Sequence, residues 1–130
     1  MTNYLNAGIY FLAAGAMVLL STALYELITK YRAWDQIGKG NGAAALSMGG
    51  IVVGVANIMH SAISSNDTLL QTMSWGAIGI AALVLVYLAF ELFTPKLNVN
   101  DELEKGNIAV GILSFAFSIA MSLVISACIM

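Results

Sequence analysis

Two eight-residue stretches decide the fold of this chain: WDQIGKGN at residues 34–41 and NDELEKGN at residues 100–107. Each stretch ends in Lys-Gly-Asn, and each is followed by a long apolar run. Matching segments also precede them, YELIT at residues 25–29 and FELFT at residues 90–94. This recurrence predicts a single domain over residues 1–130 that contains two repeats, at about residues 4–65 and 69–130.

The composition places this domain in a membrane. Of the 130 residues, 60% are hydrophobic and 9% are charged, whereas soluble domains carry about 25% charged residues. Four apolar stretches, at residues 4–29, 41–64, 69–93 and 107–130, each exceed the ~20 residues that a helix needs to cross a bilayer. Backbone polar groups in hydrocarbon must be paired within the segment, which favours helices. The sequence therefore predicts an all-α membrane protein with four transmembrane helices.

The basic residues predict the orientation of these helices. All five lie in the two loops that contain the repeated stretches: Lys30, Arg32, Lys39, Lys96 and Lys105. Loops rich in Lys and Arg face the cytoplasm, so we expect both termini on the periplasmic side, with the first apolar run retained as a helix. Because each unit has two helices, both units cross the membrane in the same sense, which makes them parallel repeats.

The motifs of the second repeat carry a family resemblance. LFTP at residues 92–95 and EKGNIAV at residues 104–110 resemble the YjfL-type bacterial inner-membrane proteins, which contain domain of unknown function 350. The first repeat departs from the pattern, with Lys30 in place of Pro95 and Gly42 in place of Ile108. The resemblance covers nearly the whole chain. It implies a small multi-pass protein of the bacterial inner membrane, and it supplies no activity or site residues.

Polar residues beside the loops have two interpretations each. Asn41 and Asn107 stand where the second and fourth apolar runs begin, so they are expected to cap helices, with a pore entrance as the alternative. Glu26 and Glu91 occupy equivalent places near the ends of the first and third runs. Glu26 lies four residues before Lys30, a spacing that favours an ion pair on a helix. Carboxylates inside membranes are also often ion or proton sites.

Two stripes of small or polar residues follow helical spacing. In the second apolar run they are Ala43, Ser47, Gly50, Gly54, Asn57 and Ser61, and in the fourth they are Ser114, Ser118, Ser122 and Ser126. Gly50 and Gly54 form a GxxxG pair, which usually brings helix backbones close together. Packing is the favoured interpretation of both stripes, and the polar lining of an oligomeric pore is the alternative.

Other sites are not indicated. His60 is expected to be a membrane-interface residue, with a pH-sensitive contact as the alternative. The sequence contains no cluster of metal-ligand residues, no phosphate or dinucleotide loop and no nucleophile motif, so we expect no cofactor and no enzymatic activity. The five basic residues do not form the clustered face that nucleic-acid binding requires.

Two functions are consistent with this pattern, and the polar residues within the apolar runs favour the first over the second. The first is an oligomeric channel- or transporter-like module for a small ion or solute, with a polar pathway through Glu26, Glu91, Asn41, Asn107, Asn57, Ser114, Ser118 and Ser122. The second is a non-catalytic anchor that docks a cytosolic protein through its two loops, with Trp34, Asp35, Asp101, Glu102 and Glu104 as the docking surface. In both cases we expect the protein to form homo-oligomers in the bilayer.

Overall fold

A computed structural model describes residues 3–29, 32–93 and 98–130, and these residues form helices and short connections without any strand. In chain order the helices are α1 (Asn3–Ile28), α2 (Ala33–Gly38), α3 (Gly42–Ser65), α4 (Leu69–Phe93), α5 (Val99–Glu104) and α6 (Ile108–Ile129). Helices α1, α3, α4 and α6 are long and apolar enough to cross a membrane. The prediction of an all-α protein with four membrane-length helices is confirmed.

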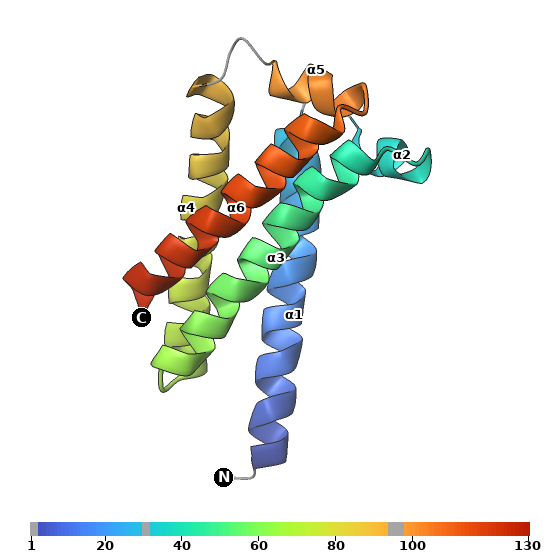
Figure 1. Cartoon of the computed structure of the whole chain (residues 1–130). Helices are drawn as coiled ribbons and strands as arrows, with labels where there is room; N and C mark the ends of the chain where they lie inside the picture. The colour runs from blue at the N-terminus through green and yellow to red at the C-terminus, as the bar shows by residue number, and fades with distance from the viewer. Residues whose placement is uncertain (1–2, 30–31, 94–97) are drawn as a thin grey trace.

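The short helices α2 and α5 lie at one end of the bundle, and the N-terminus and the turn between α3 and α4 lie at the other (Figure 1). The sequence did not predict these two helices, because each has only six residues. Isolated helices of this length are not stable in water, so their order comes from contacts with the rest of the chain.

Helix α3 is the centre of the bundle. It packs against each of the other long helices, and its most extensive contact is with α6. Helices α3 and α6 run side by side in the same direction (Figure 1). Helix α4 packs on both of them, whereas α1 packs mainly on α3.

The contact between α3 and α6 is close because glycine stands at three crossing points. A Cβ atom at Gly50 would lie 2.8 Å from the Cα atom of Phe115, and one at Gly111 would lie 2.7 Å from the Cα atom of Ala43. At Gly54 it would lie 3.1 Å from the Cβ atom of Ser122. Gly50 and Gly54 of the GxxxG pair therefore pack against α6 of the same chain.

The two halves have matching turns after their short helices. Gly40 and Gly106 have φ angles of +88° and +86°, a left-handed conformation that glycine adopts at low cost. The asparagines that follow also match, with φ and ψ of −76° and 98° at Asn41 and −70° and 100° at Asn107. These turns have the local geometry that a duplicated unit would have. The parallel-repeat arrangement and the periplasmic termini stay predictions.

Neighbouring glycines on α3 allow a matched test of the close contact. We expect Gly50→Ala to destabilise the protein by about 1–3 kcal/mol, because the new methyl group overpacks a backbone contact. Gly49→Ala has no atom within 4 Å of the new Cβ position, so it should be neutral or stabilise the helix by up to about 1 kcal/mol. Reversible unfolding in detergent micelles measures both. Equal effects of the two substitutions would contradict the close contact.

Candidate functional site

A buried cluster of hydroxyl groups joins the four long helices in the half of the bundle nearer to α2 and α5. The Tyr25 hydroxyl donates to Ser47 Oγ at 2.7 Å, and Ser47 Oγ lies 2.9 Å from both the Tyr87 hydroxyl and Ser114 Oγ. All four side chains are at most 1% exposed. An unpaired hydroxyl in an apolar medium is costly. Ser47 therefore satisfies polar groups from α1, α4 and α6 at one point.

Sequence reasoning found only part of this cluster. Ser47 and Ser114 belong to the two predicted stripes, but neither tyrosine was assigned to the site. The available signal was that a buried tyrosine hydroxyl usually finds a hydrogen-bond partner. The rings of Tyr25 and Tyr87 are also in edge contact, with centroids 5.9 Å apart.

A second polar group lies further along the same contact between α3 and α6. Asn57 Nδ2 donates to Ser126 Oγ at 3.0 Å and to Ser122 Oγ at 3.4 Å. Ser118 lies between the two polar groups, is buried, and has a hydroxyl without a hydrogen-bond partner among the described residues. The serines of α6 therefore face α3, and the predicted packing role accounts for their burial.

Glu26 holds the start of α2. Its carboxylate oxygens accept hydrogen bonds from the backbone N–H groups of Ala33 at 3.2 Å and Trp34 at 3.1 Å. The first N–H groups of a helix have no partner within the helix, and negative charge is favourable there. Arg32, the residue before α2, makes no side-chain cap, so Glu26 takes that role from the end of α1. The predicted ion pair with Lys30 lies outside the described residues.

Glu91 has a related position at the end of α4. Its Oε2 atom accepts a hydrogen bond from Asn100 Nδ2, on α5, at 3.2 Å. Each acidic residue thus links the end of a long helix to the short helix that follows it. Lys96, the basic residue expected near Glu91, lies outside the described residues.

Asn41 and Asn107 cap α3 and α6, as the sequence predicts. Asn41 Oδ1 accepts from the N–H of Ala44 at 3.1 Å, and Asn107 Oδ1 accepts from Ala109 and Val110. Asn41 also reaches into the other half of the chain. Its Nδ2 atom donates to the carbonyl oxygens of Leu103 at 2.8 Å and Glu104 at 3.1 Å. These two bonds satisfy carbonyls at the end of α5, which a six-residue helix cannot pair internally.

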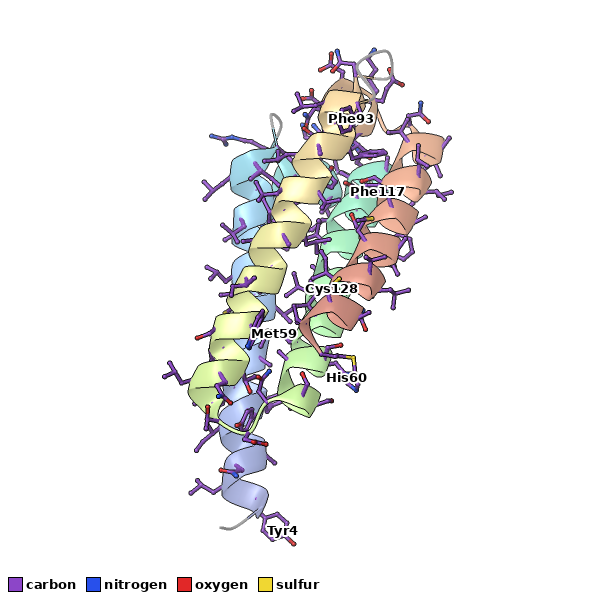
Figure 2. The ribbon with its side chains drawn as sticks, turned by 90° about the vertical axis from the view of Figure 1, so that its left-hand side faces the viewer. Tyr4, Met59, His60, Phe93, Phe117 and Cys128 are labelled. Carbon is purple, nitrogen blue, oxygen red and sulfur yellow. The ribbon has the colours of Figure 1, made fainter. Side chains whose placement is uncertain are left out.

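His60 is exposed near the opposite end of α3 (Figure 2). It borders a shallow groove of about 290 Å³ between α1 and α3, together with mainly apolar side chains such as Val18 and Met59. A larger groove of about 430 Å³ between α1 and α4 is lined by apolar residues alone. No group of three or more metal-ligating side chains occurs in the part of the chain that the structure describes.

Comparison with known proteins agrees with this architecture. Residues 1–129 match the family described as Domain of Unknown Function (DUF350). The chain belongs to the DUF350 family. It is 40% identical, over 118 residues, to the UPF0719 transmembrane protein YshE of Bacillus subtilis (strain 168), an alignment that covers 91% of this chain and 88% of that protein.

No solved structure matches the chain. This DUF350 chain is thus a small multi-pass membrane protein, and the family resemblance of its motifs is confirmed. Nothing in the family description or in the name of the relative points to catalysis.

Removal of the Ser47 hydroxyl tests the cluster. Ser47→Ala removes the hydroxyl to which Tyr25, Tyr87 and Ser114 all bond, so we expect a loss of roughly 1–3 kcal/mol of stability. Ser64→Ala is the control, because the exposed Ser64 hydroxyl bonds the His60 carbonyl of its own helix and no other group among the described residues, and a loss below about 0.5 kcal/mol is expected. Thermal unfolding in micelles compares them, and an unchanged transition in Ser47→Ala would refute the role of the cluster.

Proposed function

We propose that this DUF350 protein is a non-catalytic membrane scaffold that docks a cytosolic protein on its short helices, α2 and α5. The observation that supports this proposal best is the bond from Asn41 to the end of α5. Asn41 stands between α2 and α3, so this bond ties the first loop of the chain to the second. A protein that only anchors in lipid, without binding a partner, would not require hydrogen bonds between its two loops.

The other contacts at this end of the bundle have the same effect. Glu26 fixes the start of α2 on the end of α1, and Asn107 Nδ2 donates to Glu102 Oε1 at 2.8 Å. The buried residues Ala33 and Leu103 add apolar contacts beneath the two helices. We call the exposed surface of α2 and α5 the platform. Its order favours a partner that binds a preformed shape, because little entropy is then lost on binding.

The exposed side chains of the platform suit a protein partner. Trp34 is 54% exposed, and tryptophan is among the residues that contribute most to protein interfaces. Exposed charged residues of both signs lie on α2 and α5 or directly beside them: Arg32, Asp35, Lys39, Asp101, Glu104 and Lys105. Arg32 pairs with Asp35 (3.6 Å) and Lys105 with the half-buried Glu102 (3.8 Å) at the surface of the protein, and surface ion pairs contribute little to stability. The charges are therefore available to select a partner of complementary pattern.

Site-specific photo-crosslinking in cells tests this proposal. A benzophenone amino acid is placed at position 34, at position 104, and at Trp75 as a control near the other end of the bundle. We expect positions 34 and 104 to give an adduct with the same cytosolic protein, identified by mass spectrometry, and position 75 to give none.

A substitution shows whether the indole contributes to binding. Trp34→Ala should lower the yield of the adduct from position 104 by on the order of tenfold, as expected for the loss of an interface tryptophan, while Trp75→Ala should leave it unchanged. Adducts with lipid alone at positions 34 and 104 would assign Trp34 to the membrane interface and would contradict docking.

One observation favours the other candidate function, an oligomeric pathway for a small ion or solute. Ser118 has a buried hydroxyl without a partner among the described residues, and it lies on the same serine face as Ser114 and Ser122. A pathway along this face would require α3 and α6 to separate, because Gly50 and Gly54 leave no room between them. Such opening would expose Ser118 and Asn57, and it would give a role to Glu26 and Glu91 at the mouth.

Reconstituted vesicles distinguish the candidates. Under the scaffold proposal, vesicles with the purified protein should pass K⁺, H⁺ and Cl⁻ no faster than protein-free vesicles in a dye-based flux assay. Flux that is present in the unmodified protein and falls with Ser118→Ala or Glu91→Gln, but not with the exposed control Ser64→Ala, would establish the pathway instead.

A further inference from the structure

Asn41 is the one asparagine of this chain that is followed by glycine, in the sequence Gly40-Asn41-Gly42. Glycine has no side chain to shield its own backbone nitrogen, and its backbone turns more freely than that of other residues. In such a pair the glycine nitrogen can attack the side-chain amide of the asparagine. The counterpart in the second repeat, Asn107, is followed by the branched side chain of Ile108, which hinders the same attack.

The structure explains why glycine stands after Asn41. A Cβ atom at Gly42 would lie 3.1 Å from the Cδ1 atom of Ile108, so the contact between α3 and α6 favours a residue without a side chain. Asn41 itself is half-buried, at the end of the bundle where α2 and α5 lie (Figure 1). Its Oδ1 atom caps the N–H of Ala44 and not that of Gly42. The reacting pair is therefore within reach of water.

The amide nitrogen of Asn41 faces three oxygen atoms that accept hydrogen bonds. Besides the carbonyl oxygens of Leu103 and Glu104, at 2.8 Å and 3.1 Å, it lies 3.3 Å from Oε1 of Gln36. An amide nitrogen is a donor, with two hydrogens to give. The position therefore requires a donor, and the bonds to α5 depend on the one atom that hydrolysis of the amide would remove.

We propose that Asn41 is a site of deamidation, and that this reaction detaches α5 from the start of α3. The backbone nitrogen of Gly42 attacks Cγ of Asn41 and forms a new N–C bond, which closes a succinimide ring. The bond from Cγ to Nδ2 breaks, and Nδ2 leaves as ammonia with the proton of the Gly42 N–H. Water then opens the ring at either carbonyl carbon and yields aspartate or isoaspartate. The reaction thus consumes water and releases ammonia.

Both products replace the Nδ2 donor by a carboxylate, which only accepts hydrogen bonds. At the position of Nδ2 its oxygen would face the carbonyl oxygens of Leu103 and Glu104, so the two bonds to α5 give way to repulsion. A helix of six residues is not stable without such contacts. The aspartate product still caps α3, because aspartate is as good a cap as asparagine and negative charge is favourable at a helix start. The effect therefore falls on α5.

The bonds to α5 also control when the reaction takes place. The side chain of Asn41 must rotate toward the Gly42 nitrogen, and Nδ2 cannot keep its partners on α5 during this movement. The reaction therefore starts from chains in which the end of α5 has opened locally, and its rate follows the population of that open state. A protein bound to the platform would hold α5 closed and slow the reaction. This last step rests on the proposed function, whereas deamidation of Asn41 does not.

Mass spectrometry of aged protein tests the site. The full-length protein in lipid nanodiscs is incubated at mildly alkaline pH, which favours loss of the backbone N–H proton, and is then digested. We expect the acid form to accumulate several times faster at Asn41 than at Asn107, which has the same cap geometry. Gly42→Ala should slow the reaction at Asn41, and Gly49→Ala should not. Equal rates at the two asparagines, or no acid form at Asn41, would overturn the proposal.

Hydrogen–deuterium exchange in nanodiscs tests the release of α5. In Asn41→Asp we expect faster exchange in peptides that cover α5 and unchanged exchange in α3. Asn66→Asp adds the same charge at the other end of α3 and should leave α5 unchanged. Asn41→Ser keeps a capping oxygen without the amide nitrogen or a new charge, so it should also speed exchange in α5.

The outcomes separate this inference from the docking proposal. Unchanged exchange of α5 in both Asn41 variants, with the fold kept, would overturn the release. Photo-crosslinking from position 104 in Asn41→Asp then tests the regulation of docking. A lower yield of the cytosolic adduct would support it. An equal yield despite faster exchange would overturn the regulation and leave the deamidation site in place, and no adduct in the unmodified protein would contradict docking alone.

Discussion

The structure depends on the backbone contact between α3 and α6. At Gly50 and Gly111 the two helices come so close that neither position has room for a methyl group. In hydrocarbon, helices gain nothing from the burial of apolar surface, so association depends on close packing and on hydrogen bonds between helices. The small residues supply the packing. Hydrogen bonds join the two helices toward both ends of this contact, between Ser47 and Ser114 and between Asn57 and Ser126.

The loop end is organised by the same need to pair polar groups. Helices of six residues leave nearly all of their terminal N–H and C=O groups without internal partners. Glu26 supplies acceptors at the start of α2, and Asn41 supplies a donor at the end of α5. Glu26 and Asn41, which the sequence offered as candidates for a pore mouth, therefore pair polar groups at the ends of α2 and α5. An ordered surface on these two helices is what the docking proposal requires.

The sequence predicted the elements whose signal is either a long apolar run or a pattern of a few residues within one helix. Four apolar runs, the caps at Asn41 and Asn107, and the packing of Gly50 and Gly54 follow from length, spacing and the chemistry of one helix end. The cluster at Ser47 could not be predicted, because it depends on which faces of four helices meet. The bond from Asn41 to Leu103 joins residues 62 positions apart, and helices α2 and α5 were too short for any periodicity to reveal.

The pairing of α3 with α6 has a consequence for biogenesis. Asn57 and Ser126 are separated by 69 residues, so α3 enters the membrane well before its principal partner has been synthesised. During that interval its amide and its glycine-lined face need temporary cover from lipid, from water or from the insertion machinery. In chain order α1, α3 and α4 are synthesised first, and α6, which has the most extensive contact with α3, comes last. A chain that stops before residue 108 would lack this final step and should be a preferred substrate for membrane quality-control proteases.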